Sequence, residues 1–301
     1  MSERAHIPVL CAEAVAALCP HAEPQIGVYV DCTFGRGGHA RALLARLAPE
    51  ARLIAFDRDP AAEEAAAPLL ADPRFTFLPR PFSALSECLA ALGVAEINGL
   101  LADLGVSSPQ LDDPTRGFSF SHDGPLDMRM DPRCGASAAD WLAEVTEEDL
   151  ADTLYYYGEE RLSRRIARAL VAARAQTPIT RTAELAELVA SAMPRRDGPR
   201  HPATRTFQAI RIAVNAELKE VDALLRAAPQ WLACGARMAV ISFHSLEDRQ
   251  VKLHFRDLAG GQSPSDRQFA NVGKPVTASV EELAANPRAR SARLRVLERT
   301  A

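Results

Sequence analysis

Cysteine patterns that form disulfides or bind metals are missing from this chain of 301 residues. Its six cysteines are scattered, without a C-x-x-C pair and without histidine partners. This spacing disfavours both a zinc site and the disulfide framework of a small secreted domain. We therefore expect no bound metal and a protein that works in the reducing environment of the cytoplasm.

Long apolar runs are also missing. Residues 7–18 form the N-terminal apolar stretch, but Pro8 and Glu13 interrupt it and it is too short to span a bilayer. No basic segment with a cleavage site surrounds it. We expect an amphipathic helix there.

Lysine is scarce, because only three of the 35 basic residues are lysine and the others are arginine. A genome that favours alanine and arginine codons explains this bias, so arginine content alone does not indicate nucleic-acid binding. The net charge of -4 gives no general attraction to polyanions. Any nucleic-acid surface must therefore be a local basic face.

What the chain does contain is an alternation of short apolar segments and helical patterns, which is typical of βαβ units. We expect strands at residues 27–31, 52–57, 74–78, 98–104 and 236–242, with helices near residues 39–47, 60–71 and 83–92. Nearly continuous apolar strands indicate a parallel sheet that is covered on both faces. The predicted fold class is α/β, with a Rossmann-like sheet.

A long insertion separates the fourth and fifth expected strands. About 130 residues lie between them, whereas a parallel crossover usually needs only a dozen or two. The pattern from Ala138 to Met193 is helical, with an N-cap expected at Thr146. We therefore expect an inserted all-α domain at residues 112–206, and a Rossmann-like domain built from residues 1–111 and 207–301.

The segment after the insertion predicts one long helix from Thr204 to Arg226. Six apolar residues fall on one narrow stripe at a period of 3.6 residues: Phe207, Ile210, Val214, Leu218, Val221 and Leu225. Farther on, residues 259–276 are rich in Gly, Ser and Pro and predict a mobile loop, and Ser279 to Glu282 resembles a capping box. Arg293–Arg299 alternates basic and apolar residues, as an edge strand does.

A glycine-rich turn follows the first expected strand. Its residues, Asp31 to His39, need glycine where the backbone passes close to a ligand. Gly35-x-Gly37-x-x-Ala40 also satisfies the dinucleotide fingerprint, and Asp57 follows where it can bind a ribose hydroxyl. Asp31 favours the other interpretation, because it resembles the acidic residue of the D-x-G-x-G-x-G turn of S-adenosylmethionine enzymes. A carboxylate there can engage that cofactor's amino-acid end but would repel a pyrophosphate.

Two further segments end expected strands near the same crevice. Phe82 follows the third strand, where an aromatic ring can flank an adenine; a phenylalanine of the core explains it equally well. Asp103 to Gln110 follows the fourth strand and brings a carboxylate, two hydroxyls and an amide. Such a polar loop beside the glycine turn favours a functional role.

Together these segments resemble the bacterial family, known as RsmH or MraW, that methylates the exocyclic N4 amine of a cytidine in 16S ribosomal RNA of the small subunit. The matching stretches are His6–Leu10, Asp31–His39, Asp103–Leu111, Arg116–Phe120, Gly124–Asp131, Tyr157–Glu160, His201–Gln208, Ser242–Arg249 and Asn286–Ser291. They span nearly the whole chain.

The resemblance implies a Rossmann-like methyltransferase sheet that binds S-adenosyl-L-methionine, with 16S rRNA in the small ribosomal subunit as partner. Contacts with the cofactor are implied at Gly37, Gly38, His39, Asp57, Phe82, Asp103 and Gln110. The stretch 259–276 is shorter than in many relatives, so an RNA contact there is in doubt.

The N4 amine of cytosine is a weak nucleophile, so catalysis should rest on alignment and on acceptors for its N–H groups. Asp103 is the expected catalytic acceptor, although other amino methyltransferases carry a polar-Pro-Pro-aromatic motif that this strand end lacks. His244 is a second acceptor, a substrate contact or a structural histidine. Two alternatives remain open: an NAD(P)-dependent oxidoreductase and a non-catalytic ribosome-assembly factor on the same fold.

Arginines supply two further hypotheses. Arg211 lies at the edge of the apolar stripe, so we expect it to pair with a carboxylate or to contact RNA. Arg161, Arg164, Arg165 and Arg168 share one helix face, which is either a solvated surface or an RNA-binding surface, together with Arg195, Arg196 and Arg200.

Overall fold

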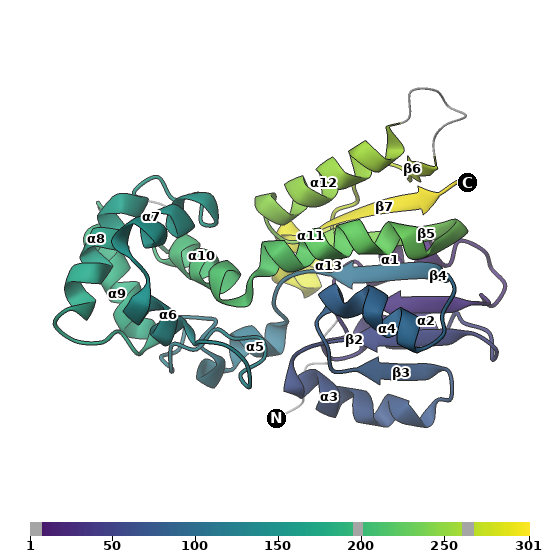
Figure 1. The fold of residues 1–301 in the computed structure, drawn as a ribbon, viewed down its shortest axis with the longest axis horizontal. Helices are drawn as coiled ribbons and strands as arrows, with labels where there is room; N and C mark the ends of the chain where they lie inside the picture. Colours follow the sequence, from purple (N-terminus) through teal and green to yellow (C-terminus); the bar gives the residue numbers. More distant parts are fainter. Residues whose placement is uncertain (1–7, 195–200, 261–267) are drawn as a thin grey trace. The chain divides into compact units, whose positions relative to one another are not determined.

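The computed structural model describes residues 8–194, 201–260 and 268–301 (Figure 1). Arg195, Arg196 and Arg200 lie outside the described residues. The chain divides into two compact units: residues up to Gly105 together with those from Leu218 onward, here called the sheet unit, and Val106–Glu217, here called the helical unit. The helical unit therefore begins before residue 112 and ends well after residue 206, the limits expected from the sequence.

The sheet unit contains one sheet in the order β3-β2-β1-β4-β5-β7-β6. Its strands are β1 Val28–Asp31, β2 Arg52–Phe56, β3 Phe75–Leu78, β4 Ile97–Asp103, β5 Leu232–Ser242, β6 Phe269–Asn271 and β7 Arg293–Arg299. The first five are parallel, whereas β7 pairs antiparallel with both β5 and β6. The expected Rossmann-like sheet is therefore confirmed.

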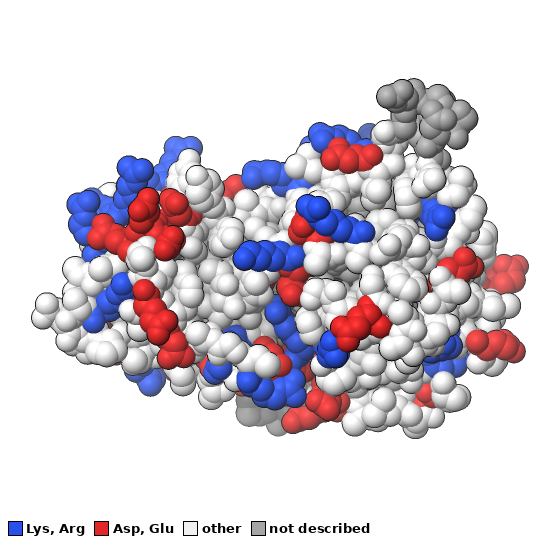
Figure 2. Space-filling view, viewed as in Figure 1, with Lys and Arg blue, Asp and Glu red and all other residues white. Residues whose placement is uncertain are grey.

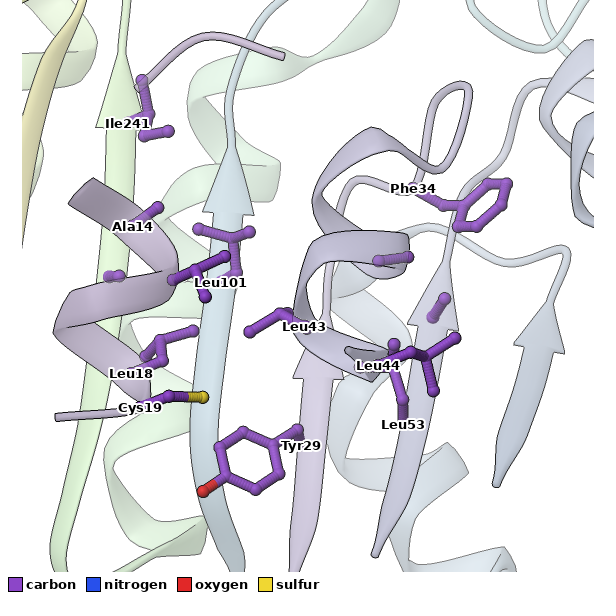
Figure 3. Packing of buried hydrophobic residues seen from close by; sticks show 14 of the residues in the cluster. Ala14, Leu18, Cys19, Tyr29, Phe34, Leu43, Leu44, Leu53, Leu101 and Ile241 are labelled. Carbon is purple, nitrogen blue, oxygen red and sulfur yellow. The ribbon is translucent and has the colours of Figure 1, made fainter. Parts of the chain in front are cut away.

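Alternating strand residues separate two apolar clusters, one on each face of the sheet. Tyr29 and Leu101 belong to one cluster, while their neighbours Val30 and Leu100 belong to the other. This is the two-residue period expected of a strand buried on both faces. The first cluster is closed by α1 Cys11–Leu18, α2 Gly38–Leu44 and α3 Pro60–Ala66, and the second by α4 Leu85–Ala91, α11 Glu217–Ala227 and α12 Ser245–Ala259. Figure 3 shows Ala14, Leu18 and Leu43 packed toward the strands in the first cluster.

The helical unit has its own apolar core, formed by one cluster of buried residues. Its helices are α5 Ser108–Asp112, α6 Ala138–Glu144, α7 Glu147–Tyr156, α8 Ser163–Arg174, α9 Thr182–Ala192 and α10 Thr204–Asn215. The expected N-cap at Thr146 is confirmed, because its hydroxyl accepts the N–H of Asp149 at 3.0 Å. Capping of this kind satisfies an N–H that has no partner inside the helix.

The prediction of one helix from Thr204 to Arg226 is wrong. Ala216 adopts a left-handed conformation with φ of 50°, so α10 ends at Asn215 and α11 begins at Glu217. The buried amide of Asn215 accepts the N–H of Met130 and donates to the carbonyl of Met128, both at 2.7 Å. The apolar stripe hides this break because its period continues across one residue of altered φ.

The C-terminal segment differs from expectation in two places. Residues 269–271, inside the expected mobile loop, form β6, and residues 261–267 lie outside the described part of the chain. Since β6 pairs with β7, Arg293–Arg299 is a strand as expected but not the edge strand. The cap at Ser279 is confirmed, because its hydroxyl accepts the N–H of Glu282 at the start of α13 Val280–Ala285.

The N-terminal helix α1 is shorter than the expected stretch 7–18, and residue 7 is not among the described residues. Among the helices that the structure describes, none is both long and apolar enough to cross a membrane.

Candidate functional site

Acidic side chains gather where the parallel strands of the sheet unit end. Asp31 is the last residue of β1, Asp57 follows β2 and Asp103 is the last residue of β4. Strands β1 and β4 are neighbours in the sheet, and the chain runs outward in opposite directions from this pair. Such a switch point is where open α/β sheets bind ligands, at the carboxyl ends of the strands.

Asp57 fastens the glycine turn to β2. One carboxylate oxygen accepts the N–H of Gly35 at 2.7 Å, and the other accepts the N–H of Asp59 at 2.9 Å. Burial raises the pKa of this carboxyl, and the N–H groups of Asp59 and Gly35 oppose the rise. The sequence assigned Asp57 to a ribose hydroxyl alone, so its structural role in the turn was missed.

Glycine is required in the turn for two different reasons. Gly35 and Gly37 have φ of +55° and +74°, a region that residues with a Cβ rarely adopt. At Gly38 a Cβ would lie 2.8 Å from the ring of Pro8, which is too close. At Gly35 no atom lies within 4 Å of a Cβ position, so the outer side of the turn is open to a ligand.

Asp31 is fully buried and only half satisfied. Its Oδ1 accepts the N–H of Thr33 at 3.0 Å, while its Oδ2 has no hydrogen-bond partner among the described residues. Burial raises the pKa of Asp31 from 3.8 to about 7. Thr33 also accepts the N–H of Asp103 at 2.6 Å, which ties the ends of β1 and β4 together. This link between the two strand ends was not predicted from the sequence.

Asp103 is the second buried carboxyl with an unused oxygen. Its Oδ1 lacks a hydrogen-bond partner within the described chain, and its Oδ2 lies 3.8 Å from Nδ1 of His39. Burial, followed by the nearby charges of Asp31 and Glu247, raises the pKa of Asp103 well above its ordinary value. His39 is held in place by a contact of 3.0 Å between its Nε2 and the carbonyl oxygen of Val9.

His244 caps α12. Its Nδ1 accepts the N–H of Glu247 at 3.4 Å, and its Nε2 lies 3.1 Å from Oε1 of Glu247. Nδ1 of His244 therefore has a structural role as a helix cap, whereas its buried Nε2 makes no hydrogen bond to a described residue. Glu247 itself is buried and accepts the N–H of Phe243 at 2.8 Å. The sequence did not single out Glu247, although its position three residues after the cap of a helix was a usable signal.

Phe82 and Gln110 each have local contacts of their own. Phe82 opens a short 3-10 helix after β3 and packs partly against the second apolar cluster. Gln110 belongs to the helical unit, where its side-chain oxygen accepts the N–H of Ser107 at 2.8 Å and helps to cap α5. The described structure therefore brings together Asp31, Gly37, His39, Asp57 and Asp103, and it gives Gln110 a capping role of its own.

The chemistry of the site fits a ligand that brings hydrogen-bond donors. Two buried carboxyl oxygens, on Asp31 and Asp103, lack donors within the described residues, and unsatisfied buried acceptors are costly. An ammonium group or a hydroxyl would satisfy them, whereas a pyrophosphate would be repelled by the same carboxylates. This geometry favours the amino-acid and ribose groups of S-adenosylmethionine over a dinucleotide.

Comparison with known proteins agrees with this preference. The family model described as the MraW methylase family matches residues 3–300. The chain belongs to this family. The ribosomal RNA small subunit methyltransferase H of Thiobacillus denitrificans is 54% identical over 310 residues, which cover 99% of this chain and 98% of that protein. The protein of the same name from Chromobacterium violaceum is 52% identical over 312 residues, covering 98% and 95%.

Solved structures resemble the chain more distantly. One of them is an rRNA methylase from Streptococcus thermophilus, with a TM-score of 0.42 and 12% sequence identity. The match covers 96% of this chain and 95% of that protein.

Proposed function

We propose that the chain transfers a methyl group from S-adenosyl-L-methionine to N4 of a cytidine in 16S ribosomal RNA of the small ribosomal subunit. Membership of the MraW methylase family carries the proposal. The names of two relatives that match the full chain at more than half identity support an rRNA substrate. Neither the oxidoreductase nor the non-catalytic assembly factor is supported by these relatives.

Within this proposal the sheet unit holds the methyl donor. Asp57 and the glycine turn engage its ribose, and the free oxygen of Asp31 meets its ammonium group. Gly37, Gly38, His39 and Phe82 border the same cofactor, and Gln110 is an additional contact implied by family resemblance. The cofactor supplies a methyl group activated by a neighbouring sulfonium.

Asp103 is the proposed catalytic acceptor. Methylation at N4 makes the amine more acidic, so one of its protons must leave as the new C–N bond forms. In its ionised form, a buried carboxylate whose pKa is raised is a stronger base than an exposed aspartate, and its free oxygen can then take that proton. His39, whose Nδ1 lies 3.8 Å away, helps to orient the carboxylate.

The helical unit is the proposed substrate-recognition domain, corresponding to the expected insertion at residues 112–206. The basic face, defined as Arg161, Arg164, Arg165 and Arg168, is exposed on α8 and just before it. Only Arg168 among these four has a carboxylate nearby in the described chain, at 3.7 Å from Glu147. Figure 2 shows basic and acidic side chains close together on the part of the surface formed by this unit.

The other arginines of the helical unit are used within the fold. Each described one contacts a carboxylate or a backbone carbonyl: Arg116, Arg129, Arg133, Arg174, Arg181, Arg205 and Arg211. Arg211 pairs with Glu217 through two hydrogen bonds of 2.7 and 2.8 Å, which confirms the expected carboxylate partner. Arg161, Arg164 and Arg165 are therefore the guanidinium groups best placed to bind phosphates.

Methyl transfer in a purified system tests the proposal. The full chain is incubated with S-adenosylmethionine labelled in its methyl group and with small subunits from a strain that lacks the protein. We expect label in 16S rRNA from those subunits and little label in subunits from the parent strain, which are already modified. Binding of subunits without label transfer would favour the assembly factor instead.

A further inference from the structure

Two neighbouring tyrosines on the helical unit are exposed without a structural reason. Tyr155 and Tyr156 are 53% and 62% exposed, and their rings meet edge to face with centroids 5.2 Å apart. Other large exposed apolar residues of the described chain occur singly, and single ones need no explanation. Neither tyrosine hydroxyl makes a hydrogen bond to another described residue. An exposed pair of rings therefore calls for a partner.

The pair lies at the end of α7 that faces the start of α8. Arg168, in the middle of α8, reaches Glu147 at the start of α7, so the two packed helices run antiparallel. The connection between them is short and held by hydrogen bonds: Glu160 donates its N–H to the carbonyl of Leu154, and its carboxylate accepts the N–H of Leu162. The last turn of α7 is therefore held beside Arg161, Arg164 and Arg165.

This arrangement places flat rings next to positive charge that the fold does not use. Aromatic side chains stack on unpaired bases, and arginines bind the phosphates that flank them. Three of the four acidic residues of α7 lie in its first turn, at the opposite end from the tyrosines. Asp152, one turn before the tyrosines, and Glu159, after them, are the exposed acidic residues nearest to the pair in sequence. A protein partner would also cover the rings, but the unneutralised arginines favour a polyanion.

We propose that Tyr155 and Tyr156 form a stacking platform for an unpaired base of the RNA substrate, with Arg161, Arg164 and Arg165 binding the adjacent phosphates. The inference rests on the proposed function for the nature of the substrate. It adds that the RNA is single-stranded where it crosses the end of α7, since bases within a duplex have no free faces to stack on tyrosine.

A titration with fluorescent RNA tests the platform. The probe is a single-stranded RNA of about 12 nucleotides with 2-aminopurine at its centre, because stacking quenches this base. It is titrated with the full chain, with the double variant Tyr155→Ala/Tyr156→Ala and with Tyr155→Phe/Tyr156→Phe. Leu70→Ala, which truncates an exposed apolar residue of the sheet unit, serves as the control.

We expect the alanine variant to bind about tenfold more weakly or worse and to lose the quenching. The phenylalanine variant should keep both, because stacking needs the ring and not the hydroxyl. Removing the tyrosines should leave the salt dependence of binding unchanged, since they contact no phosphate. Equal melting temperatures would exclude misfolding as the cause.

Three outcomes would overturn the platform: no binding by the unmodified chain, equal affinity in the alanine variant, or stronger binding to the matching duplex. If the alanine variant binds RNA normally but fails to methylate whole small subunits, the rings contact a protein and the inference is wrong. Methyl transfer by the unmodified chain is measured in parallel. Its absence would contradict the proposed function, while the titration still decides the role of the tyrosines.

Discussion

At the scale of single residues, Asp57 performs two tasks with one carboxylate. It holds the N–H groups of Gly35 and Asp59, and it is the proposed acceptor for a ribose hydroxyl. An ionised oxygen can accept more than one hydrogen bond, so the two tasks are compatible. Both tasks depend on the same carboxylate, so its removal should weaken the glycine turn and the binding of the ribose together.

We expect Asp57→Ala to weaken S-adenosylhomocysteine binding about 10-fold to 150-fold, because a hydrogen bond to a charged group and the support of the turn are lost. Isothermal titration calorimetry measures the change. Asp72→Ala is a matched control, since Asp72 also accepts a backbone N–H but lies in the turn before β3. An unaltered dissociation constant in Asp57→Ala would remove Asp57 from the site.

Asp31 makes stability depend on pH. Its pKa is about 7 in the folded chain against 3.8 as the ordinary value, so folding favours the protonated form. The stability that this preference contributes is fully present below about pH 4 and is lost as pH rises through about 7. Without ligand, the ionised Asp31 therefore lowers the free energy of unfolding at pH 8.

We expect Asp31→Asn to raise the free energy of unfolding at pH 8 by up to about 4 kcal/mol, since asparagine cannot ionise. Near pH 4 the gain should vanish. Urea unfolding of the ligand-free chain at both pH values measures this gain in stability. Binding of S-adenosylmethionine should weaken in the same variant. A gain of equal size at both pH values would contradict the assignment of the titration to Asp31.

At the scale of helices and strands, the break at Ala216 separates α10 from α11. An alanine in the left-handed region is strained, and glycine is not. Ala216→Gly should therefore stabilise the chain by up to about 1 kcal/mol. Ala216→Val is the opposite control and should destabilise it. If the helix were continuous, glycine would instead cost about 1 kcal/mol, so the sign of the change decides between the two structures.

The basic face is tested by charge reversal. Replacing Arg161, Arg164 and Arg165 with glutamate should leave the melting temperature and S-adenosylhomocysteine binding nearly unchanged, because all three are exposed in a unit remote in sequence from the glycine turn. Methylation of small subunits should collapse, and the salt dependence of RNA binding should flatten as phosphate contacts disappear. Arg226→Glu provides a control on α11. Normal methylation by the triple variant would place RNA binding elsewhere.

Sequence periodicity predicted most elements because burial on one or two faces leaves a clear pattern. The strands and the caps at Thr146 and Ser279 are examples. The pattern failed where one backbone angle decides the outcome, as at Ala216. It also failed for β6, because a strand of three residues is too short to show a period.

Only some residues of the candidate site could be predicted from the sequence. The glycine turn and the acidic strand ends were visible because their residue types are tied to fixed positions along the chain. Thr33 was not, since its importance arises from a contact between strand ends that only the fold creates. Glu247 was overlooked although it lies three residues after a helix cap, and its closeness to Asp103 arises only in the fold. The unused oxygens of Asp31 and Asp103 are likewise invisible without coordinates.

At the scale of the whole molecule, the central claim is that this family member modifies one amine of 16S rRNA. The most direct measurement is mass spectrometry of nucleosides from 16S rRNA of a strain that lacks the protein, with and without a plasmid-borne copy. We predict that a cytidine methylated at N4 disappears in the strain and returns with the unmodified copy but not with Asp103→Asn. An unchanged set of methylated cytidines in the strain that lacks the protein would contradict the account.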